Sequence, residues 1–241
     1  MLGLSDGRVL PAQHRYKVTF PNDQRLITPE LHYPMGKEPI VVANSGAALK
    51  NLAFQIGDDG LTIITASAEN KLYFAHFERE ETLMGDVNFS RDVELELPYP
   101  SAPVTHLLID KDQRELYIAS EGGYLTFYDI QDKDEPKLMQ HTAVTSAGAE
   151  ITALRSLTGG ISVLIGTSKG ELAQWSIIRD ETNRDGSESS EKLVKFRDFT
   201  PLGAAIHTII PEFNRKGFKK IIHFLNGHVF ILNETGSQFG K

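Results

Sequence analysis

The histidines come closest to a metal-binding pattern in this sequence. His223 and His228 flank the turn signal Asn226-Gly227, and a hairpin there would bring the two flanking strands together. A zinc site needs at least a third ligand, which its own hydrogen bonds hold in place. No third ligand is identifiable, and the chain contains no cysteine. We therefore expect no metal and no other cofactor, and interpret these histidines as ordinary strand or surface residues.

Two acidic clusters have the composition of calcium loops but not the spacing. Asp110-Lys111-Asp112 is the first, and the second contains Asp129, Asp132 and Asp134-Glu135. Neither has the glycine and the bidentate glutamate at the positions that an EF-hand loop requires. We interpret both clusters as charged turns.

Signals for nucleophilic catalysis or phosphate binding are absent. Ser45-Gly46 and Gly159-Gly160 resemble turns, and the sequence contains no GxSxG elbow, P-loop or GxGxxG. No two carboxylates can be paired as acid and base, because the sequence does not fix their separation. We therefore assign no catalytic residue and expect that the protein is not an enzyme.

The most basic stretch contains Arg215, Lys216, Lys219 and Lys220. Such a cluster can bind an anion, an acidic partner or lipid head groups, although a solvated loop before the strand at Ile221 is the simpler interpretation. The whole chain has 25 basic and 32 acidic residues, which gives a formal charge of −7. We expect no nucleic-acid partner, because phosphate neutralisation needs clustered lysine and arginine.

Composition describes an ordinary globular protein that can bury a sizeable core. The chain has 241 residues, of which 40% are apolar and 24% are charged. The absence of cysteine excludes disulfides, thiol catalysis and thiolate-bound metal sites. No apolar run approaches the ~18–20 residues that a membrane helix needs.

Strand signals recur along the chain in one repeating unit. An apolar strand leads to a turn and a second strand, with a further strand before the pair and another after it. Each turn contains residues that accept positive φ, as a two-residue primed hairpin requires. The four turns are Glu69-Asn70, Gly122-Gly123, Lys169-Gly170 and Asn226-Gly227, and each is followed by an apolar residue, namely Leu72, Leu125, Leu172 or Val229.

This repeat predicts an all-β fold. Four strands in each unit, recurring about every 50 residues, are typical of β-propeller blades. A truncated copy opens the chain at Asp6-Gly7, and residues 11–39 form either an irregular blade or a linker. We predict a divergent WD40-like propeller of about five four-stranded units, incomplete at its N-terminus, that forms a single domain over residues 1–241. A sandwich or barrel of hairpins is the alternative.

The last third of the chain resembles a known family. A "W…RD" strand end, an "R-x-F" strand and a "P-E-x-x-R-K-G-F" segment occur here in the same order as in the WD40-like extramembrane domain of large bacterial phosphate ABC transporter permeases of the PstC type. The matching positions are Trp175, Arg179, Asp180, Arg197, Phe199, Pro211, Glu212, Arg215, Lys216, Gly217 and Phe218. We interpret these signature residues as structural. Trp175 is expected to close a strand that faces the blade interior, and its indole N–H needs one partner.

The resemblance implies a function and a location. The chain would be a domain excised from a longer membrane protein, tethered by helices outside this sequence, on the periplasmic face of the bacterial inner membrane. It would serve phosphate transport as a docking, gating or sensing module, with other transporter subunits or the substrate-binding protein as partners. The alternatives are a free-standing propeller scaffold for protein–protein interaction and, last, a propeller hydrolase or lyase.

Overall fold

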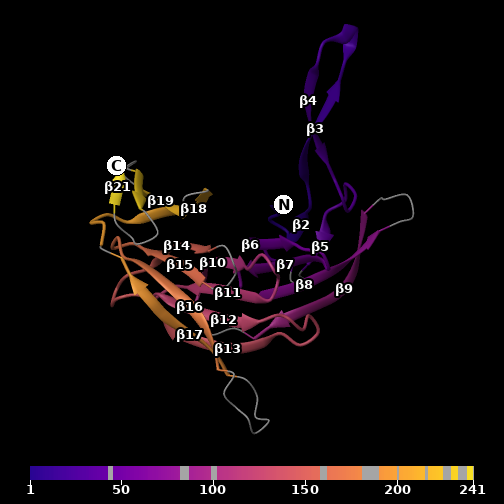
Figure 1. Ribbon diagram of the computed structural model, residues 1–241. Helices are drawn as coiled ribbons and strands as arrows, with labels where there is room; N and C mark the ends of the chain where they lie inside the picture. The colour runs from indigo at the N-terminus through magenta and orange to yellow at the C-terminus, as the bar shows by residue number, and fades with distance from the viewer. Residues whose placement is uncertain are drawn as a thin grey trace. The chain divides into compact units, whose positions relative to one another are not determined.

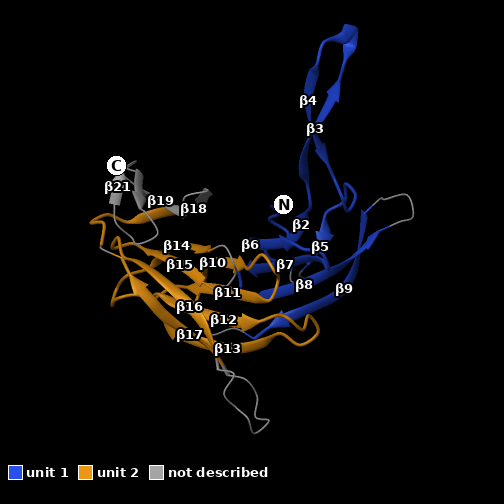
Figure 2. Cartoon of the chain, in the orientation of Figure 1, with its two compact units in different colours: residues 1–99 blue, residues 100–241 orange. Residues whose placement is uncertain are grey.

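The computed structural model describes residues 1–42, 46–81, 87–98, 102–157, 162–180, 190–199, 201–214, 217–224, 229–232 and 238–240, with only the backbone from residue 212 onward. The protein is all-β, with 64% of its residues in strands. The chain divides into two compact units, residues 1–99 and 100–241 (Figure 2). The single domain predicted for residues 1–241 stays a prediction.

Unit 1 contains three antiparallel sheets in its described part. Strands β1 (Leu2–Gly3), β2 (Arg8–Leu10) and β5 (Ile40–Val41) form a small sheet, which corresponds to the truncated N-terminal copy. A four-stranded sheet follows in the order β6 (Leu49–Ile56), β7 (Gly60–Ser67), β8 (Leu72–Glu81) and β9 (Val87–Leu97).

The segment predicted as an irregular blade or linker folds as a separate hairpin. Strands β3 (Gln13–Thr19) and β4 (Leu26–His32) pair only with each other, and a short 3-10 helix, η1 (Pro21–Asp23), lies between them. The base of the hairpin lies near the four-stranded sheet of unit 1, and its far end projects away from that sheet (Figure 1). Residues 13–18 and 26–31 are exposed, so neither face of the hairpin is covered.

Unit 2 contains three four-stranded antiparallel sheets, each of consecutive strands. The first is β10 (Val104–Ile109), β11 (Glu115–Ser120), β12 (Tyr124–Asp129) and β13 (Lys137–Ala143). The second is β14 (Ile151–Ser156), β15 (Ser162–Thr167), β16 (Leu172–Asp180) and β17 (Ser190–Asp198). The third is β18 (Ile206–Asn214), β19 (Gly217–Phe224), β20 (Val229–Leu232) and β21 (Gln238–Gly240). The predicted four-stranded unit is confirmed.

The core of each unit is built on its central strands. All eight residues of β7 and all six of β11 are buried, as are five of the six in β15. Such strands carry apolar residues on both faces, which explains why their sequences read as continuous apolar runs rather than strict alternations. The predicted post-turn residues Leu72, Leu125 and Leu172 are all buried. No helix in the described part of the chain is long and apolar enough to cross a membrane.

The hairpin turns use positive φ where the sequence predicts it, but two of them are not primed turns. Asn70 has φ 61° and Gly170 has φ 79°, whereas Glu69 and Lys169 do not have positive φ. Asn70 N–H donates to the Ser67 carbonyl at 3.0 Å, and the Thr167 carbonyl accepts the equivalent bond at 3.1 Å. These are three-residue hairpins that end in one left-handed residue. The turn at Asn226-Gly227 lies outside the described residues.

The left-handed conformation of Gly170 coincides with a close backbone approach. A Cβ at Gly170 would lie 2.5 Å from the Ala204 carbonyl oxygen, whereas a Cβ at Gly203 (φ 74°) meets nothing within 4 Å. Gly170→Ala therefore combines conformational strain with a clash against backbone, and Gly203→Ala carries strain alone. We expect unfolding free energies lower by about 3 and about 1 kcal/mol respectively, measured by urea denaturation. Equal losses would contradict the clash.

Candidate binding pocket

A cavity of about 420 Å³ lies in unit 2 between the first two of its sheets. The end of β13 and the residues after it, including Thr145, form one wall, and β15, β16 and the end of β17 form the other. The volume falls within the range of small-ligand and side-chain pockets. Two of the signature residues line the cavity, Trp175 and Phe199.

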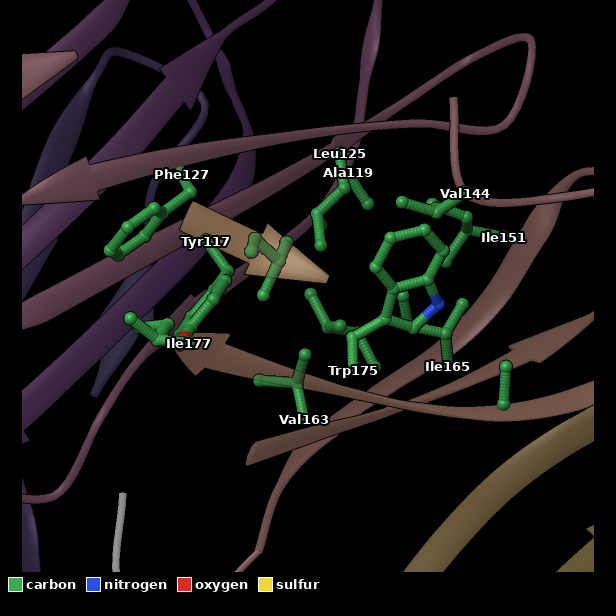
Figure 3. Packing of buried hydrophobic residues seen from close by; sticks show 13 residues of the cluster. Tyr117, Ala119, Leu125, Phe127, Val144, Ile151, Val163, Ile165, Trp175 and Ile177 are labelled. Atoms are coloured by element: carbon green, nitrogen blue, oxygen red, sulfur yellow. The ribbon is translucent and has the colours of Figure 1, made fainter. Parts of the chain in front are cut away.

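Trp175 lines this cavity and also belongs to the hydrophobic core of unit 2. Its indole ring lies among Val144, Ile151 and Ile165 (Figure 3), and the residue is only 8% exposed. The prediction that Trp175 faces the interior is confirmed, but it does not close its strand, because β16 continues to Asp180. Among the described residues the indole N–H has no hydrogen-bond partner. A buried donor without an acceptor costs about 1–3 kcal/mol, which the apolar packing of the indole ring must offset.

Charged side chains line the same cavity. The Lys195 ammonium lies 5.7 Å from the centroid of the Trp175 ring and 3.1 Å from Asp198 Oδ1. Glu171 also lines it, and its carboxylate accepts a hydrogen bond from Thr167 Oγ1 at 3.2 Å. The cavity therefore combines an apolar wall with charges of both signs.

A second network connects the same two sheets through Arg179 at the end of β16. Its Nη2 donates to Glu115 Oε1 at 3.0 Å, and its Nε donates to Glu191 Oε1 at 2.5 Å. Tyr117 donates its hydroxyl hydrogen to Glu115 Oε2 at 2.6 Å. Arg179 thus links β16 to β11 of the neighbouring sheet and to β17 of its own sheet.

Burial dominates the ionisation of Glu115. Its side chain is only 5% exposed, and desolvation raises its pKa from 4.5 to about 7. The hydrogen bond from Tyr117 opposes this shift, and so does the charge of Arg179, whereas the neighbouring carboxylate of Asp110 adds to it. Burial likewise raises the pKa of Tyr117 far above its usual value, so its hydroxyl remains a donor.

The other signature residues do not gather around one site. Arg197 lies over the ring of Phe199, 5.7 Å from its centroid, and Phe199 is buried in the core of unit 2. Pro211 and Glu212 lie in β18, while Gly217 and Phe218 lie in β19, which pairs with it. Asp180 is the last residue of β16. Of the basic stretch, Arg215 and Lys216 lie outside the described residues, whereas Lys219 and Lys220 lie in β19, opposite Glu212 and Pro211 of β18.

The remaining sequence candidates have simpler roles where they are described. Asp110 is a turn residue whose carboxylate accepts backbone N–H bonds from Asp112, Arg114 and Glu115. In the described part of the chain, no three histidine, aspartate or glutamate side chains are grouped to hold a metal ion. His228 lies outside the described residues, and His223 is described only as a strand position. Sequence reasoning missed Glu115, although its position two residues before Tyr117 in a predicted strand puts both on one face.

Comparison with solved structures shows the fold to be that of WD40 β-propellers. The β-propeller domain of Myceliophteria thermophila Cps50 (Swd1) has a TM-score of 0.56 at 14% identity, covering 80% of this chain and 59% of its own. Saccharomyces cerevisiae Sqt1 gives 0.54 at 14%, with 77% and 45% covered. The Dos1 propeller gives 0.52 at 15%, with 89% and 49% covered.

These likenesses confirm the predicted propeller class and extend no further than the fold. The chain spans about half the length of the solved structures it matches. No family model and no curated protein sequence matches the chain. Function must therefore be argued from the site.

The raised pKa of Glu115 predicts a pH-dependent stability of unit 2. The folded protein holds this proton more tightly than the unfolded chain, so the stabilisation is complete below pH 4.5 and is lost as pH rises through about 7. We expect Glu115→Gln, which cannot titrate, to remove a pH-dependent part of the unfolding free energy of about 3 kcal/mol.

Urea unfolding between pH 5 and pH 8, followed by the fluorescence of the single tryptophan, measures this difference. Exposed Glu121→Gln is the matched control and should keep the wild-type pH profile. A wild-type profile in Glu115→Gln would contradict the assignment.

Proposed function

We propose that this protein is a non-catalytic β-propeller scaffold that binds segments of other proteins, and that the Trp175 cavity is one of its binding sites. The observation that carries the proposal is a cavity of side-chain size in which the apolar side chains of Trp175 and Phe199 lie beside the charged side chains of Lys195 and Asp198. The WD40 β-propeller fold supports it at the level of architecture.

The cavity suits a peptide better than a small polar metabolite. An apolar side chain of the partner would fill the space beside Trp175 and Phe199. Lys195 and Asp198 lie at the same cavity and can bind polar groups on either side of that side chain. No nucleic-acid partner is proposed, because the chain carries a charge of −7.

A finer second proposal comes from the sequence motifs. The order of the signature residues from Trp175 to Phe218 favours the periplasmic extramembrane domain of a PstC-type phosphate permease, with transporter subunits or the substrate-binding protein as partners. The three similar solved structures, Swd1, Sqt1 and Dos1, are WD40 β-propeller domains, and none of them is a phosphate permease. Apolar stretches of ~20 residues on both sides of this segment in the native reading frame would support the permease. A reading frame without such apolar stretches would contradict the permease proposal and would not affect the scaffold proposal.

The cavity proposal predicts that Trp175→Phe weakens partner binding while the fold persists. Phenylalanine has a smaller ring and removes part of the aromatic surface at the cavity, so we expect about tenfold less binding of partners captured from cells. Tyr117→Phe is the matched control, because it removes a buried polar hydrogen in the same core but not at the cavity.

Quantitative mass spectrometry of captured proteins, together with the melting temperature of each variant, provides the measurement. Because Trp175 is the only tryptophan, its emission should also shift when a captured partner is added to the wild type. Equal capture by Trp175→Phe and the wild type would contradict a binding role for the cavity.

A further inference from the structure

A second cavity, of about 930 Å³, lies in unit 1 where hairpin β3–β4 meets sheet β6–β9. We call it the basic cleft. Its charged side chains are Arg15 from β3 and Arg79 from β8, and His14 and His32 lie beside them. No aspartate or glutamate is among the described residues that line it. In a chain of net charge −7, this is a local concentration of positive charge.

The two arginines of the basic cleft are not neutralised by ion pairs with described residues. Arg15 Nε donates to the neutral Gln13 side chain at 3.0 Å, and Glu30, across the strand pair from Arg15, forms no ion pair in the described part of the chain. Arg8 and Arg179, in contrast, each bind a carboxylate. The cleft therefore presents positive charge to an incoming anionic group.

The hairpin continues this cleft with an uncovered apolar face. Opposite residues of an antiparallel pair share a face, and three such pairs, His14 with Leu31, Tyr16 with Pro29 and Val18 with Ile27, are apolar or aromatic. Tyr16 is 65% exposed and Leu31 is 62% exposed. We call these six residues the apolar face. His14 belongs to both surfaces, so the apolar face and the basic cleft are continuous.

The opposite face of the hairpin is largely polar, so the six exposed residues of the apolar face lie together on one side of the hairpin. Arg15, Lys17, Thr28 and Glu30 alternate with the apolar residues along the two strands. The sheet β6–β9 adds exposed Phe54 and Ile56 at the cleft. Exposed apolar patches of this kind mark interaction surfaces.

We propose that the basic cleft binds one extended segment of a partner protein, in which acidic residues accompany large apolar ones. Carboxylates of the segment bind Arg15 and Arg79, and its apolar side chains pack against Phe54 and Ile56, which line the same cleft. Two guanidinium groups are too few for a nucleic-acid backbone, and the surface lacks the polybasic cluster of a membrane site. The inference deepens the proposed scaffold function and rests on it.

Binding of a short fluorescein-labelled peptide, in which Asp alternates with Leu and Phe, tests this inference by fluorescence anisotropy. We expect the wild type to bind it, and the double variant Arg15→Glu/Arg79→Glu to bind at least about tenfold more weakly. Phe54→Ser should also weaken binding, because it removes apolar contact at the cleft without changing charge. Arg114→Glu, an exposed charge reversal in unit 2, should bind as the wild type does.

Binding of three other probes distinguishes an acidic protein segment from a basic segment, a nucleic acid and a membrane surface. A peptide with Lys in place of Asp, labelled oligo(dT) and phosphatidylserine vesicles should all bind more weakly than the acidic peptide. Stronger binding of any of these, or equal binding of the acidic peptide by the double variant, overturns the inference. Self-association that Phe54→Ser abolishes, measured by analytical ultracentrifugation, overturns it in favour of a second copy of this chain.

Capture from cells separates this inference from the proposed function. Loss of captured proteins in the double variant but not in Arg114→Glu agrees with the inference when the peptide also binds. Equal capture by the double variant and the wild type overturns the inference and leaves the scaffold function intact. Capture of no protein by the wild type overturns the scaffold function itself, whatever the peptide result.

Discussion

Burial of the central strands on both faces is the constraint on which the rest of the structure depends. Strands β7 and β11 contain no exposed residue, so each needs cover on two sides as well as hydrogen-bonded neighbours at its edges. In unit 2 the cover comes from neighbouring sheets, since β14 contacts both β10 and β18. A single four-stranded sheet of this composition could not bury its own apolar surface, which is why the unit recurs.

Two threonines in buried strands bond to histidines on the neighbouring strands. Thr62 and His76 lie 3.0 Å apart between Oγ1 and Nδ1, and Thr126 and His141 lie 2.9 Å apart in the same way. His76 and His141 therefore have a structural role. Each pair removes the cost of a buried polar group and favours one strand register.

Specific polar contacts hold the first two sheets of unit 2 against each other and so define the cavity. Gln140 forms two hydrogen bonds with the backbone of Leu193, donating to its carbonyl at 3.2 Å and accepting from its N–H at 2.9 Å. Glu150 accepts the N–H of Gly122, and Arg179 binds Glu115. The Trp175 cavity lies between sheets that are fixed at several points, so a ligand there meets a largely preformed site.

The sequence predicts the repeating unit well because its signals are local. A buried strand, a residue that accepts positive φ and an apolar residue after the turn all occur within about fifteen positions, so the four-stranded unit can be read directly. The turn type is less certain from sequence, because Asn70 and Gly170 suit both a primed turn and a three-residue turn. The difference depends on hydrogen bonds that composition does not specify.

Features that depend on distant partners could not be predicted in this way. Arg179 and Glu115 are 64 positions apart, so only the fold brings them together. Hairpin β3–β4 was obscured by its prolines, because Pro21 begins a 3-10 turn and Pro29 lies within a strand. Proline is compatible with a strand whose outer edge has no neighbour, as β4 has none in the described residues.

Net charge is a poor guide to the partners of this protein, because opposite charges are separated along the chain. The total of −7 argues against nucleic acid, yet residues 13–32 contain three arginines or lysines and two carboxylates. The excess of acid therefore lies outside the hairpin, and repulsion of an acidic partner by the rest of the chain weakens with salt over about 8–10 Å. Local charge and local apolar area at the hairpin, rather than the average over the chain, decide which segment can dock there.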